Sequence, residues 1–191
     1  NYTVGSSDVI VAVVDNGVEL NHPDLAANCL KTGHFNSVDN SSVVYPGDHG
    51  THVAGTIAAV GNNGKGIVGI AGGDSAAGKS GVKILSCQIF KNTTEGTVPG
   101  NSPAAIKYGA DHGAVISQNS WGYDFDKNKD GTLTGEELEL ALSTKIYPAD
   151  KAAVDYFIKY AGCDNKGNQL PDSPMKGGVV IFAAGNDNIS N

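Results

Sequence analysis

Two short blocks of the sequence carry residues suited to general acid–base chemistry. Asp15 follows the apolar run Val9–Val14 and opens an Asp-Asn-Gly turn. A carboxylate at that point can accept a hydrogen bond from a histidine ring, fixing its tautomer and stabilising its charged form. His49 stands in the block Asp48–Gly55, at the start of a helix whose small residues permit close packing. Alone, Asp-Asn-Gly is typical of a turn and a lone histidine is more often structural, but together they indicate a base and its orienting acid.

Residues 126–137 have the spacing of an EF-hand calcium loop. Acidic and amide side chains fall at loop positions 1, 3 and 5, glycine at 6, a backbone carbonyl at 7 and glutamate at 12. Leu138–Leu142 has the periodicity of an exiting helix, whereas residues 120–125 have a strand-and-turn pattern and provide no entering helix. We therefore expect an inserted calcium loop over residues 124–137; the alternative is an acidic turn without metal. The predicted ligands are Asp126, Asn128, Asp130, Thr132 and Glu137.

Apolar runs alternate with segments of helical spacing. The runs at 9–14, 82–90, 114–120 and 178–184 are typical of strands buried on both faces. Helical spacing falls on 52–60, 102–112 and 148–160, with Ser102 as the expected N-cap and Pro103 in the first helical position. This alternation predicts the α/β class, with a mostly parallel central sheet and helices on both faces.

Polar residues follow three of these runs. They are Asp15, Asn119 with Ser120, and Asn186. Because the carboxyl ends of parallel strands meet at one edge, where such folds bind ligands, we expect these residues to converge there.

Composition excludes several other classes. Of 191 residues, 40% are hydrophobic and 17% charged, which fits one globular domain. The net charge is −7 and all 13 basic residues are lysine, so no arginine is present for nucleic-acid contacts. No apolar stretch is long enough to insert into a membrane. Three widely spaced cysteines allow one disulfide without assigning it, and Cys87 lies in an apolar run typical of a buried residue.

Three blocks in order resemble the subtilisin (subtilase) family of serine endopeptidases. They are Asp-Asn-Gly at 15–17 followed by Asn-His-Pro-Asp-Leu at 21–25, His-Gly-Thr-His-Val-Ala-Gly at 49–55, and Ala-Ala-Gly-Asn at 183–186. The resemblance covers nearly the whole chain. It implies a three-layer, subtilisin-like α/β domain that is secreted or exposed at the cell surface. The implied activity is peptide-bond hydrolysis of a polypeptide substrate, with calcium in a structural role and no organic cofactor.

The same resemblance implies roles for individual residues. Asp15 matches the orienting acid, His49 the general base, and His52 the family's structural histidine. Asn186 matches the side-chain donor that stabilises the oxyanion, although an asparagine after glycine is also typical of a turn. Asp24 and Asn63, the latter in the loop 62–67, match a second calcium site.

Two further segments resemble the walls of the family's substrate cleft. One would pair with an extended peptide through its backbone, while the pocket between the two selects a side chain. Trp121 could alternatively serve as a core or rim aromatic residue. The two segments comprise Ser120, Trp121, Gly122, Ala183, Ala184 and Gly185.

A nucleophilic serine is the component that the sequence lacks. In subtilases it stands in a Gly-Thr-Ser helix start after the oxyanion asparagine, and this chain contains neither that motif nor a G-x-S-x-G elbow. We expect residues 1–191 to be a partial subtilase catalytic domain, incomplete at its C-terminal end and inactive alone. Its expected partner is the missing part of its own domain.

Two alternatives remain open at this stage. One is a non-catalytic pseudoprotease module that binds calcium and peptides. The other is a metal-dependent hydrolase with Asp15, His49 and His52 as ligands, which the absence of a glutamate in the helix makes less favourable.

Overall fold

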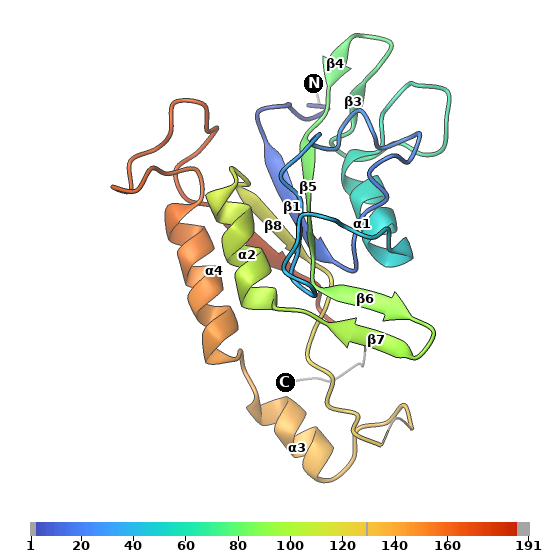
Figure 1. Ribbon diagram of the computed structural model, residues 1–191, viewed down its shortest axis with the longest axis vertical. Coiled ribbons are helices and arrows are strands. Elements are labelled where there is room, and N and C mark those ends of the chain that lie inside the picture. The colour runs from blue at the N-terminus through green and yellow to red at the C-terminus, as the bar shows by residue number, and fades with distance from the viewer. Residues whose placement is uncertain (1–2, 129, 187–191) are drawn as a thin grey trace.

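The computed structural model describes residues 3–128 and 130–186 (Figure 1). Its centre is a five-stranded parallel sheet in the order β2-β5-β1-β8-β9. The four apolar runs all form strands of this sheet, as the sequence predicts, and the two-residue β2 is a fifth strand outside these runs. The strands are β1 (Ile10–Asp15), β2 (Phe35–Asn36), β5 (Lys83–Gln88), β8 (Ile116–Asn119) and β9 (Val179–Phe182).

Helices lie on both faces of the sheet. Helices α2 (Ser102–Asp111) and α4 (Pro148–Tyr160) lie side by side on one face, and α1 (Asp48–Ala58) covers β1 and β5 on the other (Figure 1). Helix α3 (Glu136–Ser143) lies beyond the end of the sheet (Figure 1). The predicted three-layer α/β class is therefore confirmed.

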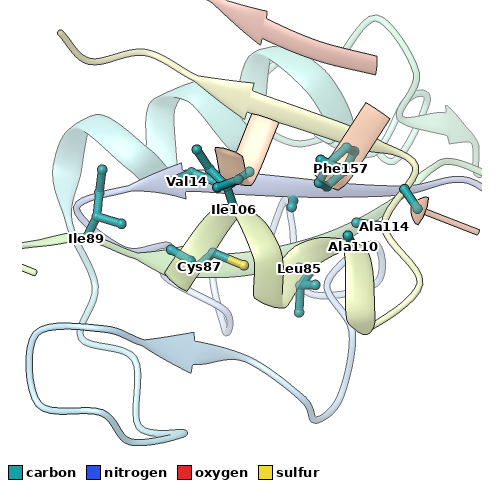
Figure 2. Packing of buried hydrophobic residues seen from close by; sticks show 12 residues of the cluster. Val14, Leu85, Cys87, Ile89, Ile106, Ala110, Ala114 and Phe157 are labelled. Carbon is teal, nitrogen blue, oxygen red and sulfur yellow. The ribbon is translucent and has the colours of Figure 1, made fainter. Parts of the chain in front are cut away.

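Side-chain alternation along β1 divides the core into two parts. Ala12 and Val14 face α2 and α4, where they join a cluster with Ile106 and Phe157 (Figure 2). Val11 and Val13 belong to the cluster on the α1 face. Because β1 is buried on both faces, neither face tolerates polar side chains until Asp15 at its carboxyl end, and this fixes the carboxylate at the sheet edge.

The sequence reading was wrong for the burial of β9. Val179 is 46% exposed and Ile181 is 45% exposed. The strand lies at the edge of the sheet, where α4 covers one face, while α1 on the other face contacts β1 and β5 instead. The apolar run therefore reflects a strand whose second face is open in the described part of the chain.

Two antiparallel ribbons accompany the main sheet. They are β3 (Gly73–Asp74) with β4 (Lys79–Ser80), and β6 (Phe90–Thr93) with β7 (Gly96–Pro99). Neither ribbon is predicted from the sequence, and the second projects beside the carboxyl edge of the sheet (Figure 1).

The N-cap predicted for α2 was wrong by one residue. The side chain of Asn101 accepts a hydrogen bond from the Ala104 backbone amide at 2.9 Å. Asn101 has extended backbone angles, and asparagine caps a helix as well as serine does. Ser102 is instead the first helical residue, and its hydroxyl donates to Asp150 at 2.7 Å.

The three cysteines are free thiols. Cys87 is fully buried, as predicted, and burial raises the pKa of its thiol to about 12. Burial also raises the pKa of Cys29 to about 11. Among the described residues, no helix is both long and apolar enough to cross a membrane.

Candidate active site

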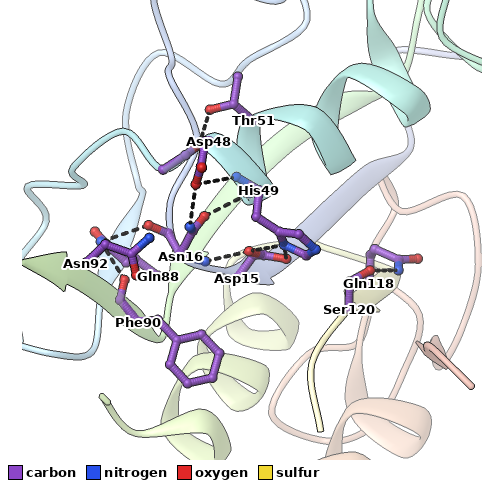
Figure 3. A network of polar contacts seen from close by, with 12 residues as sticks. Asp15, Asn16, Asp48, His49, Thr51, Gln88, Phe90, Asn92, Gln118 and Ser120 are labelled. Carbon is purple, nitrogen blue, oxygen red and sulfur yellow. Dashed lines mark hydrogen bonds and ion pairs between the residues drawn. The ribbon is translucent and has the colours of Figure 1, made fainter. Parts of the chain in front are cut away.

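Asp15 and His49 form a hydrogen-bonded pair at the carboxyl edge of the sheet (Figure 3). His49 Nδ1 lies 2.8 Å from Asp15 Oδ1 and 2.9 Å from Oδ2. The side chain of Asp15 is 4% exposed and that of His49 is 56% exposed. With Asp15 ionised, Nδ1 carries the proton and donates to the carboxylate, which leaves Nε2 able to accept a second proton.

Close backbone packing holds this pair in place. A Cβ atom added to Gly50 would lie 2.4 Å from the Gly17 carbonyl oxygen, so only glycine lets the first turn of α1 approach β1 this closely. The Gly50 amide donates to Asn16 Oδ1 at 2.8 Å. Gly17 itself has a φ of 104°, a conformation that other residues rarely adopt. The Asp-Asn-Gly turn thus packs directly against the first turn of α1, the helix that carries His49.

Asp48 adds a second anchor at the N-terminus of α1. Its Oδ1 accepts hydrogen bonds from the His49 amide at 2.8 Å and from Asn16 Nδ2 at 3.2 Å. These two donors, the His49 amide first, hold the pKa of the exposed Asp48 carboxyl below its ordinary value. Asp48 therefore remains ionised at neutral pH and helps to connect the helix start to the turn after β1.

An open cavity of about 310 Å³ lies next to the pair. Asp15, Asn16 and His49 line it together with Ser120, the residue that follows β8 (Figure 3). The predicted convergence of the β1 and β8 ends is therefore present. The ribbon β6–β7 supplies the rest of the lining, which the sequence analysis missed: Phe90, Asn92 and Thr97. The one signal of this ribbon in the sequence is Gly96, because glycine is typical of a hairpin turn. In the structure Gly96 follows the turn and has a φ of 126°.

The Ser120 hydroxyl is not engaged with the histidine. Gln118 Nε2 donates to Ser120 Oγ at 3.0 Å. Within residues 3–128 and 130–186, no serine hydroxyl hydrogen-bonds the His49 ring. The described part of the site thus combines a histidine and a carboxylate, and no serine is hydrogen-bonded to the histidine ring.

The predicted second wall begins at the same edge. Phe182 is in register with Asn119, and the Ala183 amide donates to the Asn119 carbonyl at 3.0 Å. The exposed residues Ala183, Ala184 and Gly185 follow, and Gly185 has a φ of 88°. Asn186 is exposed as well and does not line the His49 cavity. Its predicted role as oxyanion donor stays a prediction.

Trp121 and Gly122 line a separate cavity of about 220 Å³. The Trp121 ring meets that of Phe182 edge-on, with centroids 5.4 Å apart. Trp121 and Gly122 are the two residues that follow Ser120, so this second cavity continues along the predicted substrate segment.

His52 lies apart from the Asp15–His49 pair. It lines a cavity of about 630 Å³ with His22 and Asp24. In the part of the chain that the structure describes, no three His, Cys, Asp or Glu side chains converge as a metal site. Asp15, His49 and His52 therefore do not form the metal-ligand set of the alternative hydrolase.

The EF-hand-like loop is held by hydrogen bonds between its own residues. Gly131 donates through its amide to Asp126 Oδ2 at 2.9 Å, and Lys127 donates to Glu137 Oε1 at 2.9 Å. Asp130 accepts from the Thr132 hydroxyl at 2.7 Å and from its amide, which lowers the pKa of Asp130. Asp126 Oδ1 is buried and accepts no hydrogen bond from any residue within 3–128 and 130–186. Helix α3 begins at Glu136, as expected for the exiting helix.

Asp24, predicted to bind a second calcium ion, is buried and fully hydrogen-bonded. Asn63 Nδ2 donates to Asp24 Oδ1 at 2.7 Å, and the Ile67 amide donates to Oδ2 at 2.9 Å. Both carboxylate oxygens thus have protein donors, and the second calcium site stays a prediction.

Comparison with known proteins places this geometry in a family. The family model described as the subtilase family matches residues 6–191. The chain therefore belongs to the subtilases, a family of serine proteases. It is 35% identical over 182 residues to thermitase from Thermoactinomyces vulgaris, covering 95% of this chain and 56% of thermitase. It is 38% identical over 183 residues to a thermophilic serine proteinase from Bacillus sp. (strain AK1), covering 86% and 43%. The chain thus spans about half the length of these relatives.

Solved structures are similar in fold. The serine protease of Aeromonas sobria, solved with its chaperone, superimposes with a TM-score of 0.60 at 23% identity, over 96% of this chain and 26% of that one. The epidermin leader peptide processing serine protease of Staphylococcus aureus gives 0.58 at 24% identity, over 95% and 38%. These likenesses support the subtilisin-like fold alone.

Proposed function

We propose that this chain supplies the acid–base half of a subtilase that hydrolyses peptide bonds in polypeptides. The observation that carries the proposal is the 2.8 Å hydrogen bond between His49 Nδ1 and the buried Asp15 carboxylate, beside an open cavity. In the full-length protein, His49 Nε2 takes the proton of a nucleophilic serine and returns it to the leaving amine. Asp15 holds the ring in the required tautomer and stabilises the imidazolium.

The substrate segment has a defined place in this proposal. An extended peptide lies along residues 120–122 and pairs with the backbone there, with residues 183–185 as the opposing wall. Asn186 serves as oxyanion donor once the remaining site residues surround the scissile carbonyl. This step remains a prediction, since Asn186 lies outside the His49 cavity.

The nucleophile comes from outside residues 1–191 in this proposal. No serine in the described residues bonds to His49, and Ser120 is bonded to Gln118. The open face of β9, with Val179 and Ile181 about half-exposed, gives the remainder of the same domain an apolar surface to cover. The isolated chain is accordingly inactive, and the competing proposal is a peptide-binding module without catalysis.

The two α1 histidines provide a matched test. Hydrolysis of a casein-type substrate is measured for the full-length protein, His49→Ala and His52→Ala. Loss of the base should reduce kcat by at least ~10³-fold, whereas His52→Ala should keep most of the activity because His52 does not contact Asp15. Equal losses in both variants, or an inactive full-length protein, would contradict the proposed function.

We also propose that the loop over residues 126–137 binds calcium. Its oxygen-rich donor set suits a hard cation. Asp126 Oδ1, which is buried and has no partner among the described residues, is an oxygen that a cation would satisfy. Glu137 bonds to the Lys127 amide, and no three acidic side chains converge among the described residues. Binding therefore requires the loop side chains to rearrange around the ion.

Two adjacent glutamates allow a controlled calcium titration. Glu137 is buried against the loop and Glu136 is exposed. Isothermal titration should detect calcium binding to the loop in the wild type and in Glu136→Gln, and that binding event should be weakened or lost in Glu137→Gln. Identical binding by both variants would place calcium elsewhere.

The site of action is proposed to be outside the cell. The support is indirect: two matching relatives are described as a halolysin-like extracellular serine protease and a cell wall-associated protease. Detecting the protein in culture supernatant would support this location, and finding it only in the cytosolic fraction would contradict it.

A further inference from the structure

A small cavity adjoins the predicted substrate segment and lies outside the Asp15–His49 site. Its volume is about 220 Å³, below the roughly 300–1,000 Å³ typical of small-molecule sites and suited to a single side chain. A Cβ atom added to Gly122 would meet no atom within 4 Å, so this face of the segment is open. The cavity is lined by Trp121, Gly122, Tyr123, Lys145, Ile146 and Phe182.

Lys145 and Ile146 reach this cavity from the far end of the insertion. The chain leaves the substrate segment after Tyr123, passes through the EF-hand-like loop and α3, and returns at Tyr147. The Tyr147 amide donates to Tyr123 Oη at 3.0 Å, and the two rings lie 4.1 Å apart. Tyr123 Oη in turn donates to the buried Asp150 at 2.9 Å. This contact fastens the end of the insertion against the substrate segment.

Lys145 is a cation without a partner. It is exposed and makes no hydrogen bond or ion pair with another described residue. The exposed lysines Lys107 and Lys151 each pair with an aspartate four residues further along their helices. Lys166 likewise has no side-chain partner among the described residues, so Lys145 is distinguished by its place in the lining of an aromatic pocket.

We propose that Lys145 and Ile146 are specificity-determining residues of the protease. This inference rests on the proposed peptide hydrolysis. The pocket takes one apolar side chain of the bound peptide against the packed rings of Trp121 and Phe182, with Ile146 as a further apolar lining residue. The Lys145 ammonium pairs with a carboxylate on a neighbouring peptide residue. The preferred substrate is therefore a polypeptide in which an apolar residue lies next to Asp or Glu.

Paired peptides test the charge preference. Peptides that differ only by Glu or Gln are scanned across the positions flanking the cleaved bond, and kcat/KM and Kd are measured with the full-length protein at low salt. At one position, Glu should be preferred over Gln by about 2–5-fold, the size expected for an exposed ion pair, and high salt should reduce the ratio. Lys145→Met should bring the ratio to about 1, and Lys145→Glu should invert it.

Lys166 supplies the control because it is also exposed but lies in the loop after α4, away from this cavity. Lys166→Glu makes the same change in net charge and should keep the wild-type ratio. A Glu preference in Kd without cleavage would support the subsite and contradict the proposed function. The subsite is overturned if the wild type shows no preference in either measurement, or if Lys145→Glu keeps the wild-type ratio.

Discussion

The carboxyl edge of the sheet and the insertion between Tyr123 and Tyr147 are built in different ways. At the edge, Asp15 and Asn16 are buried and glycines let α1 approach the turn after β1. In the insertion, Glu137 is the only described residue that is buried. The loop is held largely by hydrogen bonds between its own residues. The insertion returns to the body of the protein through the contact between Tyr123 and Tyr147.

This difference separates two demands on a protease. General-base chemistry needs a fixed contact between two side chains, and a sheet end with close backbone packing provides it. Metal binding and substrate selection tolerate adjustment, so they can be carried by a segment with few buried contacts.

The largest effect is expected at the edge, from Asp15→Asn. The asparagine cannot stabilise the imidazolium or enforce the same tautomer, so kcat of the full-length protein should fall by ~10⁴-fold. Asp48→Asn is the matched control, since Asp48 contacts the His49 amide and not its ring. The measurement is kcat for peptide hydrolysis. Similar losses in both variants would show that the edge acts through general packing.

Calcium should stabilise the insertion alone. At a concentration about 100 times Kd, a single site stabilises the state that binds it by ~2.7 kcal/mol. Limited proteolysis should therefore cut within residues 126–143 faster after chelation, with little change in the hydrogen-exchange protection of β1 and β8. Magnesium at the same ionic strength is the control. Equal loss of protection in both regions would make the insertion part of one cooperative unit.

Two glycines of α1 should respond in opposite directions to the same change. Gly50→Ala forces a Cβ against the Gly17 carbonyl oxygen and should destabilise the protein by about 1–3 kcal/mol. In Gly55→Ala the new Cβ meets its nearest atom at 3.6 Å, so the lost backbone freedom should stabilise the helix by ~0.5–1 kcal/mol. Urea unfolding of both variants measures the difference. Equal shifts would contradict the close approach at Gly50.

The smallest effect is a pH dependence that differs between the regions. His34 is buried, and its burial lowers its pKa. Its Nδ1 accepts from the Ser86 amide at 3.1 Å, so the folded state resists protonation. As pH falls below about 6.5 the unfolded chain binds the proton first, and stability should drop by up to ~1.4 kcal/mol per unit. The lowered pKa of Asp130 has an effect of the same sign in a lower pH range, because its contribution to stability is lost only as pH falls below about 4.

Urea unfolding at pH 7 and pH 5.5 tests the histidine contribution. His34→Gln, which cannot titrate, should reduce the pH slope, whereas the exposed His112→Gln should keep it. If His34→Gln does not fold, the histidine titration followed by NMR in the wild type still gives the result. A folded-state pKa for His34 at or above 6.5 would contradict the account.

The sequence predicted the sheet because apolar runs are a local signal, and it predicted the Asp15–His49 contact because the two blocks that carry these residues resemble those of the subtilases. Apolar runs identify the strands, parallel pairing brings their carboxyl ends together, and Asp15 directly follows such a run. The ribbon β6–β7 was missed because its lining residues, Asn92 and Thr97, are exposed and carry no apolar alternation. The prediction that β9 is buried on both faces was wrong because the elements packed next to a strand, rather than its own residues, decide what covers it.

The Lys145 pocket could not be predicted from spacing. It joins residues 121–123 to residues 145–146 and Phe182 through the return of the insertion, and this depends on the contact between Tyr123 and Tyr147. Tertiary packing alone creates that neighbourhood. The calcium loop, by contrast, is a local pattern, and its metal remains a prediction.

We propose that His49 activates a serine located outside residues 1–191. Fluorophosphonate labelling followed by peptide mapping tests this proposal, with the full-length protein, its His49→Ala variant and the isolated chain. We expect one labelled serine outside residues 1–191, greatly reduced labelling in His49→Ala, and an unlabelled isolated chain. A labelled serine within residues 1–191, or full labelling in the absence of His49, would contradict the proposal.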